Sequence, residues 1–265
     1  MEADISILLK TGHFYFALTF SPLLALSILA HFRSASAILL ASQFMFPIAK
    51  SSILVVSALF PIVNPLGGAP IFLSLTHYYS TIQRKILSRK IAINSFLLLL
   101  GSYLIGTHIL AFFGISLPVV QVGGGLMVIA AGWNMLRQKE GDETRGNVQQ
   151  SVDSRDLSSR AFYPLTLPLT VGPGSISVAI TLGANEPHRG GSFLFPIIGA
   201  VIGSLVIAAS VYFCYAFADR LAQILGPTAM TMILRLTSFL LVCIGVQIFW
   251  NGLSALLNSL PAMAR

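Results

Sequence analysis

The chain has 265 residues, of which 55% are hydrophobic and 9% are charged, and its mean hydropathy is +0.82. Soluble domains usually carry about 25% charged residues, so this composition excludes an ordinary water-soluble domain. The net charge of +7 does not indicate a nucleic-acid partner, because the basic residues lie between apolar runs rather than along one amphipathic face. Cys214 and Cys243 both fall inside apolar runs, which favours neither a disulfide nor a metal site.

The first 44 residues allow three interpretations. Phe14–Ala30 is an apolar run that is short for a membrane span, and Ala35-Ser36-Ala37 after it resembles a signal-peptide cleavage site. This segment is therefore an extra span with a cytoplasmic N-terminus, a cleaved signal, or an extension upstream of a true start at Met45. All three stay open from the sequence.

After this segment, six apolar runs are long enough to cross a hydrocarbon core of about 30 Å, which takes about 20 residues. We expect an all-α polytopic membrane protein with six core transmembrane helices. The expected spans are residues 51–73, 91–113, 118–136, 161–183, 193–217 and 232–256.

The basic residues predict the orientation of these spans. Residues 77–90 carry four basic residues and residues 137–160 carry five, whereas residues 114–117 carry none and residues 184–192 carry only Arg189. Lys and Arg collect in the cytoplasmic loops of inner-membrane proteins. We therefore expect residues 77–90 and 138–160 to face the cytoplasm and both ends of the six-span core to lie outside.

The first and fourth expected spans each contain a Pro-Gly break near the middle. Proline removes a backbone N–H and glycine weakens a helix by about 1 kcal/mol, so together they unwind it locally. The two breaks supply the candidate substrate-binding residues, Asn64, Pro65, Gly67, Gly68, Gly172, Pro173, Gly174 and Ser175.

The position of the breaks predicts an internal repeat. The expected parts are residues 45–137 as a first three-helix repeat, 138–160 as a polar cytoplasmic linker, and 161–258 as a second repeat. Because three is an odd number of spans, a second copy joined by one loop enters the membrane from the opposite side. The two repeats are therefore expected to be inverted, with their breaks meeting near the middle of the membrane.

Helix breaks offer a way to bind a zwitterion without an ionised side chain. A half-helix N-terminus presents N–H groups to a carboxylate, and a half-helix C-terminus presents carbonyls to a cation. We expect Gly174 to allow close backbone approach or a left-handed backbone. The competing interpretation is that each Pro-Gly pair only kinks its helix. Other polar residues could line the pathway or only bond neighbouring helices, namely Asn94, Gln121, Asn134, Gln247 and Asn251.

Two sequence blocks carry a family resemblance. Phe60–Thr76, reading FPIVNPLGGAPIFLSLT, and Pro164–Ile176, reading PLTLPLTVGPGSI, resemble the MarC family of bacterial inner-membrane proteins. That family is also described as neutral amino-acid transporters and grouped with LysE-type exporters. The resemblance covers roughly residues 45 to 258 and implies six spans in two inverted repeats that move small neutral amino acids or related metabolites.

These observations together predict a secondary transporter of the inner membrane that works by alternating access, with a small neutral solute and the lipid bilayer as its partners. No enzymatic activity, cofactor, metal or nucleic acid is expected. The alternatives are a structural or regulatory membrane protein without a transported substrate, and a membrane-embedded enzyme. The exact substrate, the direction of transport, a coupling proton or ion, assembly into a homo-oligomer and any link to antibiotic resistance stay open.

Overall fold

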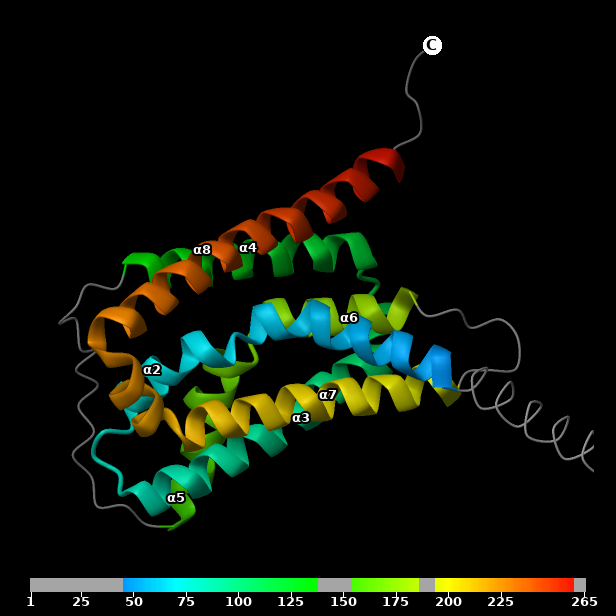
Figure 1. Ribbon diagram of the computed structural model, residues 1–265. Helices are drawn as coiled ribbons and strands as arrows, with labels where there is room; N and C mark the ends of the chain where they lie inside the picture. Colours follow the sequence, from blue (N-terminus) through cyan, green and yellow to red (C-terminus); the bar gives the residue numbers. More distant parts are fainter. Residues whose placement is uncertain (1–44, 138–153, 186–193, 260–265) are drawn as a thin grey trace, which may run out of the picture. The chain divides into compact units, whose positions relative to one another are not determined.

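A computed structural model describes residues 45–137, 154–185 and 194–259 of the chain. The chain divides into two units, Met1–Pro47 and Ile48–Arg265, and the fold reported below is that of the second. The interpretations of residues 1–44 lie outside the described residues, as does most of the expected linker. The described residues are helical and contain no strand (Figure 1). Their elements, in chain order, are a helix over residues 45–63, α2 (Pro65–Leu75), α3 (Thr81–Phe112), α4 (Leu117–Arg137), α5 (Ser154–Arg160), the π-helical segment η1 (Ala161–Thr170), α6 (Pro173–Asn185), α7 (Leu194–Ala216) and α8 (Ala218–Ser259).

Five of the six expected spans are present as helices that are long and apolar enough to cross a membrane, and the fourth is present as a bent pair of shorter apolar segments. Four are single helices, namely α3, α4, α7 and the Thr228–Ser259 part of α8. The first is Met45–Leu75, which is interrupted at Asn64, and the fourth is a pair of segments, Leu157–Thr170 and Pro173–Asn185, bent by 72°. The prediction of an all-α polytopic membrane protein is therefore confirmed, and the two interrupted spans are those in which the sequence predicts a break.

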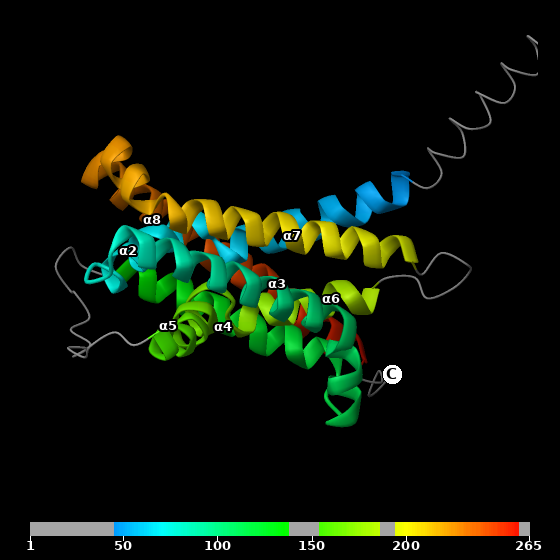
Figure 2. The ribbon, with the colours of Figure 1, turned by 90° about the horizontal axis from the view of Figure 1, so that it is seen from below.

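Helix contacts in the first half have counterparts in the second. Helix α4 packs along α8, and α3 packs along α7 (Figures 1 and 2). Helix α2 packs on α7 and α8, while α6 packs on α3 and α4. Exchanging the first three spans with the last three leaves the α4–α8 and α3–α7 contacts unchanged and converts the contacts of α2 into those of α6. This is the pattern that a two-fold related pair of three-helix units would require.

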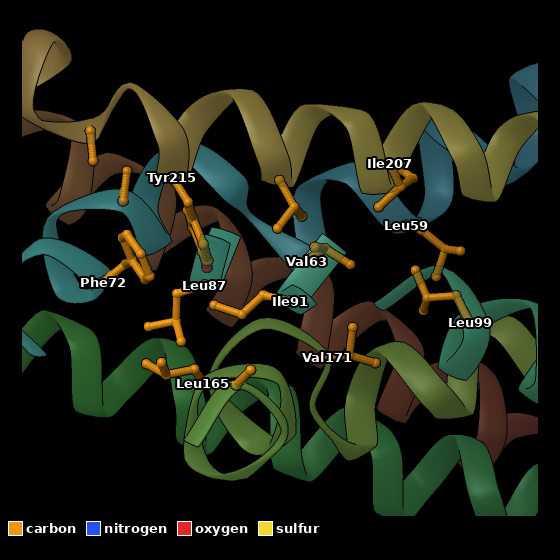
Figure 3. Close-up of a cluster of buried hydrophobic side chains, with 14 of the residues drawn as sticks. Leu59, Val63, Phe72, Leu87, Ile91, Leu99, Leu165, Val171, Ile207 and Tyr215 are labelled. Atoms are coloured by element: carbon orange, nitrogen blue, oxygen red, sulfur yellow. The ribbon is translucent and has the colours of Figure 1, made fainter. Parts of the chain in front are cut away.

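A continuous hydrophobic core joins the halves. Figure 3 shows its side chains, which come from the first helix, α2, α3, η1, Val171 and α7. Leu59, Phe72, Leu87 and Ile207 are all less than 2% exposed. Large apolar side chains on the opposite helix faces, such as Leu97 at 59% and Phe213 at 58%, remain exposed, as a surface in contact with lipid requires.

Small residues let the helices approach closely, as the Gly199 and Gly203 pair on α7 illustrates. A Cβ added at Gly199 would lie 2.6 Å from Ser51 Cβ, and one added at Gly203 would lie 2.7 Å from Val55 Cγ1. A small-xxx-small spacing of this kind permits such packing in membranes.

Most basic residues of the described ranges lie at one end of the helices. Arg84, Lys85, Arg89 and Lys90, which the sequence analysis assigns to a loop, lie instead on the first turns of α3, where Ser80 and Gln83 form a capping box. The last seven residues of the expected linker form α5 rather than a tether. We call the end that carries the start of α3, the end of α4 and α5 the basic end.

One ion pair lies at the basic end. Arg84 Nη1 donates to Asp219 Oδ1 at 2.9 Å, joining the start of α3 to the start of α8. Lys90 Nζ on α3 contacts Ser158 Oγ on α5. Both contacts connect the first three spans to the last three.

Candidate functional site

The first break is organised by Asn64. Pro65 begins α2 at the position where a missing N–H is tolerated, and its ring prevents the preceding helix from continuing unchanged. Asn64 adopts a left-handed backbone with φ 47° and ψ 61°, and its Oδ1 accepts the Gly67 N–H at 3.0 Å. The sequence Asn-Pro therefore ends one helix and caps the next.

The second break lacks a side-chain cap. Segment η1 contains Pro164 and Pro168 and has non-helical dihedral angles at Tyr163 and Leu167. Gly172 precedes α6, and its carbonyl accepts the Ser175 hydroxyl at 2.9 Å and the Ile176 N–H at 3.1 Å. Because glycine has no side chain, nothing at position 172 caps the first N–H groups of α6.

Both breaks line one cavity of about 360 Å³. Ile62, Val63 and Asn64 come from the first break, and residues 168–170 and 172–175 come from the second. The remaining walls are apolar apart from Asn134. They are formed by Gly68, Ile71, Met127, Val128, Ala130, Ala131, Asn134, Met135 and Leu241.

The cavity extends from the breaks toward the basic end. On α2 it is lined at successive turns by Asn64, Gly68 and Ile71, and α2 ends at Leu75 beside that end. On α4 the lining runs from Met127 to Met135, two residues before Arg137 closes the helix. The cavity therefore occupies the space between the breaks and the part of the helices near the basic end.

Close helix contacts occupy the other side of the second break. A Cβ added at Gly106 would collide with Ile180, and one added at Gly183 would collide with the Tyr103 carbonyl oxygen. Ser177 Oγ donates to the Val120 carbonyl at 2.9 Å, which ties α6 to α4. Helix α6 is thus closely packed on α3 and α4 from its start to its end.

Six of the eight candidate residues line the cavity, and Pro65 and Gly67 do not. Gly67 packs beneath Asn64, and a Cβ there would lie 2.7 Å from Thr237 Oγ1 of α8. Gly174 permits close approach as expected, since a Cβ would collide with Val128 Cγ2. Its φ is not positive, so the expected left-handed backbone at Gly174 is wrong, and Asn64 has it instead.

Two residues outside the candidate set support the site. Thr170 is 2% exposed, and its hydroxyl donates to the Leu165 carbonyl at 2.7 Å and lies 3.0 Å from the Tyr215 hydroxyl. Tyr215 stacks on Phe72 with ring centroids 4.7 Å apart and abuts Gly68. The tyrosine on α7 thereby joins α2 to η1, a contact between distant segments that leaves no motif in the sequence.

The other polar candidates separate into different roles. Asn134 lines the cavity. Asn94 Nδ2 donates to Thr166 Oγ1 at 3.4 Å, and Gln247 Nε2 donates to Asn251 Oδ1 at 2.9 Å on the same helix. Interhelical or local hydrogen bonding, the commoner use of such residues, therefore accounts for the last three.

The described lining of the cavity offers hydrogen bonds without an ionised side chain. It contains no Asp, Glu, Lys, Arg or His. The start of α6 presents main-chain N–H groups, while the end of the first helix at Ile62 and Val63 brings carbonyls whose usual partners are absent at a helix end. The two kinds of group have opposite partial charges and can bind both ends of a small dipolar solute.

Relatives of the chain are membrane proteins of similar length. It is 30% identical over 209 residues to the inner membrane protein MarC of Salmonella typhimurium, covering 76% of this chain and 93% of the relative. It is 32% identical over 202 residues to the membrane protein MJ1677 of Methanocaldococcus jannaschii, covering 76% and 95%. It is 29% identical over 199 residues to the membrane protein YvbG of Bacillus subtilis, covering 75% and 92%. No solved structure matches the chain.

The family profile described as MarC family integral membrane protein matches residues 49–257. This range includes both breaks, the cavity lining and all of the spans except the first residues of Met45–Leu75 and the last residues of Thr228–Ser259. The spans and the inner-membrane relatives make the chain a multi-pass protein of the inner membrane. The chain belongs to the MarC family of integral membrane proteins.

Proposed function

We propose that this protein is a secondary transporter that moves small neutral amino acids or similar small solutes across the inner membrane. The observation that supports this most directly is that both helix breaks line one cavity, although Asn64 and Gly172 are more than a hundred residues apart in sequence. Irregular backbone at membrane depth is tolerated where it is buried in protein or lines a wet cavity, and transporters place solute sites at such breaks.

The mechanism that we propose is alternating access between two inverted three-helix repeats. The corresponding contacts of α2 and α6 support a two-fold relation between the halves. In the present conformation the cavity extends to the basic end, which the positive-inside rule assigns to the cytoplasm. In the opposite conformation, α6 would separate from α3 and α4 while α2 closes on α7 and α8. This change would expose the breaks to the side of the membrane opposite the cytoplasm.

The size and lining of the cavity favour a small neutral solute. Its volume of about 360 Å³ is at the lower end of the roughly 300–1,000 Å³ range of small-molecule pockets. A divalent cation would require several oxygen ligands, usually with carboxylates among them, and the described lining has no carboxylate. Without an ionised side chain on the described walls, a solute with net charge would have no counter-charge.

Uptake into proteoliposomes tests the proposal. The full chain is reconstituted and loaded with unlabelled glycine, alanine or serine, and exchange with the labelled amino acid outside is measured. We expect exchange that exceeds that of protein-free liposomes and is competed by the other two amino acids. Exchange no faster than in protein-free liposomes for all three would contradict the proposal and favour a structural or regulatory role.

A further inference from the structure

The carboxamide of Asn64 is buried, and only its oxygen makes a hydrogen bond. The residue is 7% exposed, and its Oδ1 accepts the Gly67 N–H. Its Nδ2 has no hydrogen-bond partner among the described residues. A buried donor without a partner destabilises a folded protein, and such a donor is explained when a ligand or a water molecule accepts its hydrogen bond.

The backbone of Asn64 adds a second cost. Among the non-glycine residues of the described ranges, Asn64 alone has a positive φ. Strained dihedrals of this kind persist where the surrounding structure enforces them, and they cluster at ligand sites. The strain and the unpartnered Nδ2 therefore occur in one residue that lines the cavity.

The start of α6 supplies further donors to the same cavity. Pro173 has no N–H, so the first free amides of this 13-residue helix belong to Gly174 and Ser175. Neither amide has a partner among the described residues, and the Ser175 hydroxyl is turned back to the Gly172 carbonyl. Both residues are buried and line the cavity with Asn64.

We propose that Asn64 Nδ2 and the main-chain amides of Gly174 and Ser175 form a carboxylate subsite in the cavity. The three groups are donors, and the positive end of the α6 dipole adds to their preference for an anion. The described lining contains no Asp or Glu to repel a carboxylate and no Lys, Arg or His to neutralise it instead. This inference rests on the proposed function only in taking the cavity as the place where the solute binds.

Four small probes separate the chemical groups of the solute. L-alanine carries a carboxylate and an ammonium group, propionate only the carboxylate, and L-alaninamide and ethylamine only the amine. Binding to the full chain in detergent is measured from the shift of the thermal unfolding temperature with ligand concentration. We expect alanine to bind most tightly and propionate detectably, and we expect alaninamide to bind at least about tenfold more weakly than alanine, because a charged hydrogen bond is lost.

Asn64→Asp is the most informative variant. Asp keeps the oxygen that accepts the Gly67 N–H and replaces the free amide by a second carboxylate oxygen, which repels the solute carboxylate. We expect the Kd for alanine and propionate to rise at least about tenfold. Asn64→Gly, which adopts a left-handed backbone without strain, removes the whole carboxamide, including the Oδ1 that accepts the Gly67 N–H, but adds no charge. It should weaken the same two ligands less than Asn64→Asp does.

Asn134→Asp is the matched control, because it places the same charge on another asparagine of the same cavity. Asn134 lies on α4 near the basic end and belongs to neither break. We expect a smaller loss of alanine affinity than for Asn64→Asp. Equal losses of alanine affinity in the two Asp variants would overturn the subsite. Two other results would also overturn it: alaninamide that binds as tightly as alanine, and alanine and propionate that bind the Asn64→Gly variant as tightly as they bind the unaltered protein.

The subsite and the transport function can fail separately. Carboxylates that bind with the expected pattern but are not exchanged across proteoliposomes would contradict transport alone. Exchange of alanine that persists at its original affinity in Asn64→Asp would contradict the subsite alone.

Discussion

Helices α2 and α6 follow equivalent breaks, yet their neighbours approach them differently. Helix α6 is enclosed by α3 and α4 through Gly106, Gly124 and Gly183, with side chain or backbone filling the space that a Cβ would need at each. Helix α2 packs on Tyr215 of α7 at Gly68, but it also borders the cavity at Gly68 and at Ile71, one turn further along.

Under the alternating-access mechanism proposed above, this difference corresponds to a closed half and an open half of the path. In that mechanism the equivalent helices of the two repeats pack unequally, because only one side of a transporter is open at a time. The enclosed helix is α6, away from the basic end, and the helix beside the cavity is α2, which runs toward it. The comparison predicts that changes at α6 affect the closed side and changes at α2 affect the open side.

The largest effect is expected at Gly174, where α6 meets α4. Gly174→Val would collide with Val128 and should abolish exchange and destabilise the fold by about 1–3 kcal/mol, the usual cost of overpacking. Thermal unfolding and proteoliposome exchange measure the two effects. Gly174→Val that folds and exchanges normally would contradict the close contact.

A smaller change at Gly174 tests the same contact directly. Gly174→Ala also collides with Val128, and Val128→Ala removes the colliding methyl group while leaving the Gly124 carbonyl at 3.3 Å. The double variant should recover part of the stability, with a coupling of about 0.5–3 kcal/mol. Gly101→Ala on α3 is a control, because no atom lies within 4 Å of the added Cβ, and it should not lower the stability.

Thiol labelling should show the asymmetry of access. In a background without Cys214 and Cys243, Asn134→Cys lines the cavity and is expected to react with a membrane-impermeant reagent added from the cytoplasmic side. Ser177→Cys, buried between α6 and α4, is expected to stay unreactive from both sides. Labelling of Asn134→Cys from outside in intact cells, and not from the cytoplasm, would reverse the assigned orientation.

A moderate effect is expected for Tyr215→Phe on the α2 side. The variant keeps the stacking on Phe72 and loses the hydroxyl that bonds Thr170 at 3.0 Å, which should lower the unfolding free energy by about 0.5–1.5 kcal/mol. Ser177→Ala loses one hydrogen bond on the α6 side and should cost a similar amount. If α2 moves during transport while α6 stays packed on α3 and α4, Tyr215→Phe should change the rate of amino-acid exchange without abolishing binding. Proteoliposome exchange measures the rate, and the ligand-dependent shift of the unfolding temperature measures binding.

The smallest effect is expected at the ion pair of the basic end. The side chains of Arg84 and Asp219 are 16% and 35% exposed, and partly exposed pairs contribute about 0.2–1 kcal/mol. A double-mutant cycle of Arg84→Met and Asp219→Asn should give a coupling in this range that decreases with added salt. A coupling that does not change with salt would contradict screening of the pair by solvent.

The positions of the breaks could be predicted because they depend on local chemistry. Pro65 and Pro173 lack an N–H wherever they lie, so a long apolar run must be interrupted beside them. The same holds for the spans, since an apolar run of sufficient length needs a membrane whatever it packs against. The sequence analysis missed the start of α3, where the polar residues are good helix formers behind a capping box at Ser80. It also missed α5, which lies within the expected linker.

The amino-acid sequence by itself determined that this protein has six membrane-spanning segments and that two of them are broken. It did not determine that Asn64 is left-handed with a free Nδ2, that Gly174 faces Val128, or that Thr170, Met127 and Asn134 complete the cavity. These features depend on side chains from several helices meeting, and such contacts leave no periodic pattern along one segment. The direction in which the cavity extends was likewise decided only by the tertiary structure, because equivalent helices α2 and α6 differ in packing rather than in the chemistry of their breaks.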